Sequence, residues 1–375
     1  NSDGTPVYSY QASDNTDPLY TVTLYQASQN SFAAGTEVTA NGSNAVAVGY
    51  KSTADNSAVA VGDTAQASGD NTIAIGTNSK ATDSSGKGSI AIGKGVEANG
   101  SSTAVGLNGT KATYGSSAYG NNAVAQNGSS ALGSNIQASD GSYASGMGTA
   151  DKPVIATGSS YATGMGGTTA TKGSMAVGNN VKAGDQGGGA FAVGMGGTMA
   201  DNGSMAMGNN VSAGKNGGGA FAVGMGGTTA NSGSMAVGNN VKAGENGGGA
   251  FAVGMGGTSA DGSSMAVGDN VHATGSAFAS GRNGTSAQSG GIAYGDNVSA
   301  QYGGFAAGTN STSASSGVAV GSNVHAFDGS SYAGGMNNTT AANGSIAFGN
   351  NVHAGSSGSG GAFAAGMTGS TAGGS

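Results

Sequence analysis

The residues best suited to chemistry are the chain's three histidines, His272, His325 and His353, which occupy the same position in a repeated segment. Imidazole is the commonest protein ligand of metal ions, so a metal site is the first hypothesis. His325 and His353 lie two repeats apart, which places them about 10 Å apart in a stack of strands. One ion cannot bridge that distance. The sequence therefore predicts exposed surface histidines and no metal or cofactor.

The histidine position is polar or charged in many other repeats, which is typical of a solvent-exposed face. A second hypothesis is that this face forms a flat ledge for a partner protein. A regular array of threonines at this position would instead suggest ice binding. The array stops after Thr39 and Thr53, so the sequence does not favour that function. The residues that follow or recur at this position are Gln66, Lys80, Glu97, Gln137, Lys182, Ser212, Lys242 and Ser299.

Three glycine-rich segments, Gly184–Gly189, Gly214–Gly219 and Gly244–Gly249, recur at equal spacing. They match neither a phosphate-binding loop nor a calcium-binding nonapeptide repeat. We expect them to be loops inserted on one edge of a repeat structure, where binding functions concentrate. The candidate ligand-binding residues are Lys182, Asp185, Lys215, Lys242 and Glu245.

Composition excludes several classes of function. The 375 residues include 78 glycines, no cysteine and only 8% charged residues, with a net charge of −7. Collagen is excluded because the strict Gly-X-Y triplet does not run through the chain. The negative net charge argues against nucleic-acid binding. No run of about 20 apolar residues predicts a membrane-spanning helix. No histidine lies near a serine or aspartate in a repeated, shielded setting, so the sequence favours a protein that is not an enzyme.

A short repeated phrase positions all these residues. A 30-residue unit occurs three times, in Met165–Gly194, Met195–Gly224 and Met225–Gly254, and each copy contains the phrase twice, as SMAVG (SMAMG in the second copy) and AFAVG. The closing glycine of the phrase recurs 24 times from Gly35 to Gly366, mostly every 13 or 14 residues. That spacing fits two short strands per turn and predicts an all-β solenoid of about 24 turns. Residues 1–30 are expected to cap the solenoid, and residues 31–375 to form its repeats.

Alternation within the phrase predicts which side chains face inward. Ser, Ala and Gly would fill a narrow interior that admits only small residues, and the larger residues would point outward in an apolar stripe. Such a stripe needs a partner, and a threefold axis provides one because each residue then meets two copies of itself. Each repeat has two outward-facing positions in its phrase, and where one holds a large residue the other usually holds a small one. The pairs Ile292/Tyr294 and Ile346/Phe348 break this rule, so we expect the trimer to be wider at these two repeats. The predicted trimer core comprises Phe191, Val193, Met205, Phe221, Val223, Met235, Phe251 and Val253.

The phrases NSAVAVG (Asn56–Gly62), NTIAIG (Asn71–Gly76) and GSIAIG (Gly88–Gly93) resemble the repeats of trimeric autotransporter adhesin heads of the YadA type. The resemblance covers about Ser31 to Ser375. It implies a left-handed parallel β-roll, a homotrimer and a location on the bacterial cell surface. It also implies attachment to host receptors such as carcinoembryonic-antigen-type glycoproteins, or to matrix proteins such as collagen and fibronectin. A structural spacer with no ligand of its own is the alternative.

Two parts of that family are not recognised in this sequence, namely a heptad-patterned stalk and a C-terminal membrane barrel. The sequence also begins at Asn1 without a charged and then apolar leader. We therefore expect a head fragment of a mature protein that itself makes no membrane contact.

Overall fold

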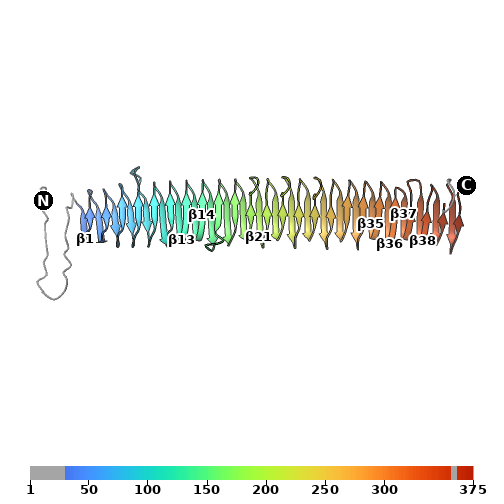
Figure 1. The fold of residues 1–375 in the computed structure, drawn as a ribbon, viewed down its shortest axis with the longest axis horizontal. Coiled ribbons are helices and arrows are strands. Elements are labelled where there is room, and N and C mark those ends of the chain that lie inside the picture. Colours follow the sequence, from blue (N-terminus) through green and yellow to red (C-terminus); the bar gives the residue numbers. More distant parts are fainter. Residues whose placement is uncertain (1–29, 356–360, 375) are drawn as a thin grey trace, which may run out of the picture. The chain divides into compact units, whose positions relative to one another are not determined.

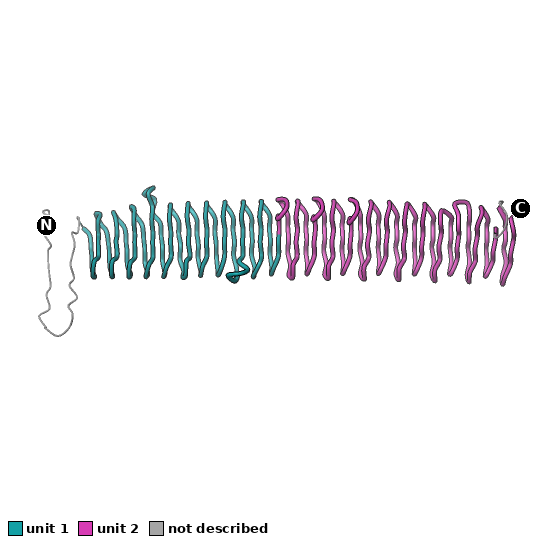
Figure 2. The backbone as a smooth tube through the Cα atoms, viewed as in Figure 1, with its two compact units in different colours: residues 1–182 teal, residues 183–375 magenta. Residues whose placement is uncertain are grey.

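The computed structural model describes residues 30–355 and 361–374, and these residues form strands and turns without any helix (Figure 1). The chain divides into two compact units, residues 1–182 and 183–375 (Figure 2). Within each unit the strands of successive turns pair in parallel. The predicted all-β parallel solenoid of about 24 turns is confirmed. The predicted N-terminal cap lies, except for Asn30, outside the described residues.

In the first unit, most turns contain one strand that carries or precedes the repeated glycine and a shorter second strand. The glycine strands are β1 (Phe32–Thr36), β3 (Val46–Tyr50), β5 (Val59–Val61), β7 (Ile73–Ile75), β9 (Ile90–Ile92), β11 (Thr103–Leu107), β15 (Tyr143–Met147), β17 (Tyr161–Met165) and β19 (Met175–Asn179). The second strands are β2 (Thr39–Ala40), β4 (Thr53–Ala54), β6 (Gln66–Ser68), β8 (Lys80–Thr82), β10 (Glu97–Asn99), β12 (Lys111–Thr113), β16 (Val154–Thr157) and β18 (Thr169–Thr171). Two strands run through a whole turn, β13 (Ser117–Gln126) and β14 (Ser130–Ser139).

The second unit repeats this plan, and the boundary between the units falls within β20 (Lys182–Ala183). Its glycine strands are β21 (Phe191–Met195), β23 (Met205–Asn209), β25 (Phe221–Met225), β27 (Met235–Asn239), β29 (Phe251–Met255), β31 (Met265–Asp269), β33 (Phe278–Arg282), β39 (Ile346–Asn350) and β41 (Phe363–Met367). Its second strands are β22 (Met199–Ala200), β24 (Ser212–Ala213), β26 (Thr229–Ala230), β28 (Lys242–Ala243), β30 (Ser259–Ala260), β32 (His272–Thr274), β34 (Ser286–Gln288), β40 (His353–Ala354) and β42 (Thr371–Ala372). Four strands run through a whole turn, β35 (Ile292–Gln301), β36 (Phe305–Ser315), β37 (Val318–Ala326) and β38 (Tyr332–Ala341).

The strand register places each repeated position above its counterpart in the next turn. Between β25 and β27, Phe221 pairs with Met235 and Gly224 pairs with Gly238. Ala222, the residue after Phe221 on β25, is completely buried, whereas Met235 is 38% exposed. The prediction that small residues of the phrase face inward and large residues face outward is therefore confirmed.

The prediction that only Ser, Ala and Gly fit the interior is wrong for one column of residues. This column precedes the second strand, and along most of the second unit it alternates between valine and threonine, as at Val211, Thr228, Val241 and Thr258, all of them fully buried. The Thr228 hydroxyl lies 3.0 Å from the Met225 carbonyl oxygen and 2.9 Å from that of Gly238. The interior is wide enough for a branched side chain here, and the buried hydroxyl is satisfied by backbone acceptors.

A buried serine column stabilises one edge of the first unit. Ser116, Ser129 and Ser142 precede the glycine strands in successive turns. The Ser129 backbone N–H donates to the Ser116 hydroxyl oxygen at 3.2 Å, and the Ser142 N–H donates to that of Ser129 at 3.1 Å. The column thus supplies acceptors for backbone donors that would otherwise be buried without a partner.

The repeated glycine is required by its backbone conformation and by the close approach of the next turn. Gly224 has a φ of +153°, and a Cβ there would collide with the Gly238 carbonyl oxygen. Both conditions recur at nearly all of the repeated glycines of the two units. An L-residue at this position meets backbone strain and a clash with atoms that cannot rotate away.

We expect Gly224→Ala to lower the free energy of unfolding by at least about 3 kcal/mol, because strain and steric overlap act together. Gly219→Ala is the matched control, since Gly219 also has a positive φ of +71° but open space around its Cβ position. The control should cost about 1 to 2 kcal/mol. Denaturant unfolding measures both values, and equal losses would show that the glycine contact between turns contributes nothing.

Candidate functional site

The outward face of the glycine strands is apolar along both units. The residues predicted for the trimer core all lie on this face and are half-buried or exposed in the single chain. A contiguous series of large apolar side chains at a protein surface is typical of a face that contacts a partner. These residues are Phe191, Val193, Met205, Phe221, Val223, Met235, Phe251 and Val253.

Part of the predicted size compensation on this face occurs between turns of the same chain. The rings of Tyr332 and Phe348 pack with centroids 4.9 Å apart, and a Cβ at Gly334 would lie 2.9 Å from the Phe348 ring. In the same way, Tyr294 packs on Phe278 at 5.0 Å. In both positions that break the size rule, an aromatic ring therefore packs on the aromatic ring of the preceding turn. Wider rows at these positions remain a prediction.

The outward face of the second strands is polar, as predicted. Lys80 is exposed, and Glu97 and Lys111 follow it in register on β10 and β12. The Lys111 ammonium lies 2.7 Å from the Glu97 carboxylate, with both side chains 45% exposed. An ion pair as exposed as this one contributes less than about 1 kcal/mol, so its main effect is on the charge pattern of the face.

The five candidate ligand-binding residues do not form a single cluster. Lys182 and Lys242 lie on the outward face of second strands, whereas Asp185, Lys215 and Glu245 lie on the glycine-rich segments. All five are exposed, and these segments protrude on one edge of the second unit (Figure 2). The charged groups of Lys242 and Glu245 lie 3.1 Å apart.

The histidines occupy the outward position of the second strands, but only His272 is as exposed as predicted; His325 and His353 are half-buried. At His325, Nδ1 lies 2.7 Å from the Ser313 hydroxyl and Nε2 lies 3.1 Å from Oδ1 of Asn323. A ring protonated on Nε2 satisfies both contacts, since Nε2–H donates to the amide oxygen and Nδ1 accepts from the hydroxyl. The same arrangement surrounds the other two histidines.

These hydrogen bonds favour a structural role for the histidines. Both ring nitrogens are engaged, and burial lowers the pKa of His325. Residues 30–355 and 361–374 contain no group of three or more His, Cys, Asp or Glu side chains that could hold a metal ion. These hydrogen-bond partners were not predicted from the sequence. The signal available for one of them was the asparagine that stands two residues before each histidine, in an Asn-Val pair.

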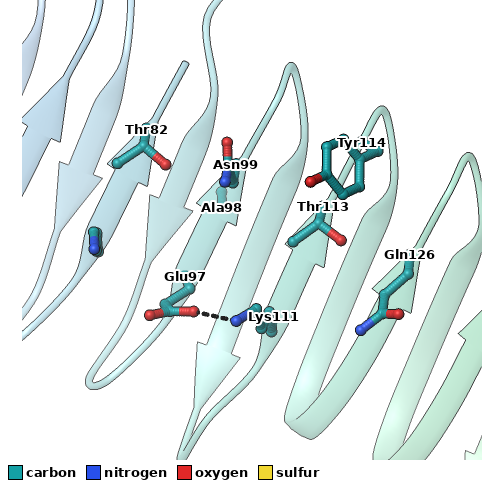
Figure 3. Close-up of a pocket in the computed structure, with 9 residues that line it drawn as sticks. Thr82, Glu97, Ala98, Asn99, Lys111, Thr113, Tyr114 and Gln126 are labelled. Atoms are coloured by element: carbon teal, nitrogen blue, oxygen red, sulfur yellow. Dashed lines mark ion pairs between the residues drawn. The ribbon is translucent and has the colours of Figure 1, made fainter. Parts of the chain in front are cut away.

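A shallow hollow of about 430 Å³ lies on the polar face of the first unit, over β8, β10, β12 and β13 (Figure 3). Tyr114 lies at its edge, where the chain turns into β13, and is 69% exposed. From the sequence, Lys80 and Glu97 were expected only to belong to an exposed face, and Tyr114 was not predicted as part of a site. An aromatic residue beside a glycine, between two strands, was the available signal. The lining residues are Lys80, Thr82, Glu97, Ala98, Asn99, Lys111, Thr113, Tyr114 and Gln126.

The carboxylates of two aspartates, the buried Asp83 and the half-buried Asp328, hold loops that connect the turns. Asp83 is 3% exposed and begins an inserted segment of the first unit. Its carboxylate accepts hydrogen bonds from the backbone N–H and hydroxyl groups of Ser85 and Ser101. Burial alone would raise the pKa of Asp83, but these hydrogen bonds outweigh it and hold the pKa below its ordinary value. Asp328 has a lowered pKa for the same reasons, with Ser331, Asn343 and Gly344 as donors.

Comparison with known families identifies the repeat. The family model of the YadA head domain repeat matches residues 28–52, 40–57 and 56–79. The predicted resemblance to YadA-type head repeats is therefore confirmed, and the same phrase continues in register through the later turns. YadA head repeats on a β-solenoid are features of a structural, adhesin-type class and not of an enzyme. No curated protein matches the chain. The described strands and turns include no helix long and apolar enough to cross a membrane.

We expect Asp83→Asn to destabilise the first unit by about 1 to 3 kcal/mol near neutral pH, because a charged acceptor of several hydrogen bonds is lost. The lowered pKa gives the sign of the pH dependence. The carboxylate stabilises the fold above its unfolded pKa of about 3.9, and this contribution disappears as the pH falls through the lower folded value. The difference in melting temperature between wild type and variant should therefore shrink in acid. Asp70→Asn, at an exposed position in the preceding turn, is the control, and an equal effect would contradict the role of Asp83.

Proposed function

We propose that this chain forms the head of a homotrimeric adhesin on a bacterial cell surface. The observation that carries the proposal is the apolar face of the glycine strands, combined with the match to YadA head repeats. The apolar face recurs turn after turn, so a partner that covers it must have the same period. Further copies of the chain meet that requirement, whereas an unrelated globular partner would cover only a few turns. The polar face of the second strands then remains in contact with solvent.

A row of methionines supports the same arrangement. Met195, Met225 and Met255 directly follow repeated glycines and are between 58% and 59% exposed in the single chain. Flexible thioether side chains pack well against a neighbouring surface, and burying the exposed part of each one in a trimer would contribute about 1 to 2 kcal/mol.

The test of the trimer is the mass in solution combined with Phe221→Asp. We expect a mass close to three times the 34.9 kDa of the chain. Phe221→Asp would place three carboxylates together in an apolar seam, where desolvation and repulsion oppose packing. We expect a lower melting temperature and faster hydrogen exchange near β25, with distant turns still paired because solenoid stability depends on nearest neighbours.

The control for this experiment is Lys182→Asp, which changes an exposed residue of the polar face. Its effect on stability should be less than about 0.5 kcal/mol. A stable monomer, or a Phe221→Asp variant as stable as Lys182→Asp, would contradict the trimer and the assignment of its inner face.

Attachment to host surfaces is the proposed role of the trimer. Host glycoproteins of the carcinoembryonic-antigen type and the matrix proteins collagen and fibronectin are the proposed partners, on the ground of the family resemblance. The glycine-rich loops are the proposed contact, because they protrude from one edge and carry different charges in an otherwise nearly identical repeat.

We expect binding to at least one of these partners in a plate assay, and a loss of about tenfold or more when the three loops are shortened together with Asp185→Ala, Lys215→Ala and Glu245→Ala. Gln66→Ala, on the polar face of the first unit, is the control and should bind normally. Undiminished binding after loop shortening would place the contact elsewhere. Failure to bind any host partner would favour the alternative of a structural spacer.

A further inference from the structure

We propose that the hollow over β8, β10, β12 and β13 binds a short acidic oligosaccharide, with a sugar ring against Tyr114 and a carboxylate at Lys80. This inference rests on the proposed adhesin function and adds a ligand class and a site to it. The hollow lies in the first unit, apart in sequence from the glycine-rich loops of the second unit.

Tyr114 provides the flat apolar surface that a sugar ring requires. Its backbone has a φ of +55°, a conformation that bulky residues rarely adopt, and its side chain is 69% exposed. Hydrogen bonds fix this conformation, since the Tyr114 N–H donates to the Asn99 carbonyl at 3.0 Å and its own carbonyl accepts from Gly128 at 2.9 Å. Figure 3 shows the ring beside Thr113 at the edge of the sheet. The polarised C–H groups of a sugar are attracted to the negative face of such a ring.

The rest of the lining is suited to sugar hydroxyl groups. Asn99 and Gln126 are exposed amides that both donate and accept, and Thr82 and Thr113 contribute hydroxyls. The lining contains no large aliphatic side chain, so it does not fit the apolar anchor of a peptide. The hollow is open and shallow, as a site for an exposed chain end would be.

The charges of the hollow favour an acidic sugar. Two lysines and one glutamate give it a net charge of +1 within a chain of net charge −7. The pKa of Glu97 is lowered because Lys111 hydrogen-bonds to its carboxylate and Lys80 adds a weaker attraction. Glu97 therefore stays ionised, and its negative charge balances the positive charge of Lys111. Within the described residues, Lys80 belongs to none of the ion pairs. Lys80 is therefore the ammonium group available to a carboxylate ligand.

The geometry sets the length of the ligand. Lys80, Glu97 and Lys111 occupy successive turns in register, and Tyr114 lies three residues beyond Lys111. At about 4.8 Å per turn and about 3.3 Å per residue, Lys80 and Tyr114 are about 14 Å apart. A single sugar ring cannot reach both groups, so the site fits an oligosaccharide.

The experiment titrates the intact protein with sialyllactose, with a hyaluronan tetrasaccharide and with lactose, followed by calorimetry or NMR. The first two probes distinguish a sialic acid from a uronic acid as the source of the carboxylate, and lactose is the neutral control. We expect at least one acidic probe to bind about tenfold more tightly than lactose, with a preference that weakens in high salt. Binding of none of the three probes would overturn the proposal.

Two variants assign the binding to this hollow. Tyr114→Ala should weaken every bound probe by about tenfold, and Lys80→Gln should remove the preference for acid while leaving lactose unaffected. Tyr302→Ala is the matched control, because Tyr302 has a φ of +49°, is 65% exposed and also precedes a glycine, but lies outside this hollow. Melting temperatures verify that each variant is folded. Equal losses for Tyr114→Ala and Tyr302→Ala would overturn the assignment.

The outcome is separable from that of the adhesin function. A chain that binds the oligosaccharides but no host surface supports this inference and contradicts the proposed role in attachment. A chain that binds a host partner equally well with and without Tyr114→Ala, and binds none of the sugars, contradicts this inference alone.

Discussion

The contact between repeated glycines of successive turns is the constraint on which the structure depends. At nearly all of these positions the backbone has a positive φ and the carbonyl of the next turn occupies the space that a Cβ would need. The turns can therefore stack at the spacing of β-strands only if this residue has no side chain. The same close approach leaves an interior lined mainly by alanine, and the branched side chains of valine and threonine lie mostly in the column before the second strand.

Because the interior is narrow, most of the larger side chains lie outside, and the two outward faces have acquired different chemistry. The glycine-strand face carries Phe, Met, Val, Ile and Tyr side chains, some of which pack on each other between turns, as Tyr143 and Tyr161 do with stacked rings 5.0 Å apart. The second-strand face carries lysine, glutamate, glutamine and histidine. An apolar face and a polar face are compatible with the adhesin-type class that the match to YadA head repeats indicates.

The turns differ in length mainly at the edges, where the chain passes from one strand to the next. There the inserted segments are held by the carboxylates of the buried Asp83 and the half-buried Asp328, which accept backbone hydrogen bonds from neighbouring turns. A fixed stack with variable edges allows surface chemistry to change without disturbing the interior. The hollow beside Tyr114 arises in this way, from one aromatic edge residue and a short series of charges.

The sequence by itself determined the fold class, the register and the direction of most side chains, because a short period repeated many times leaves few ways to pair strands. It also located the apolar face and the glycine-rich loops. Tertiary structure decided what depends on neighbours from other turns. The stacked column of Val and Thr, the hydrogen bond of His325 to Ser313 and the hydrogen bonds that Asp83 accepts from Ser101 all join residues of different turns. The hollow likewise exists only because stacking brings Lys80, Lys111 and Tyr114 onto one surface.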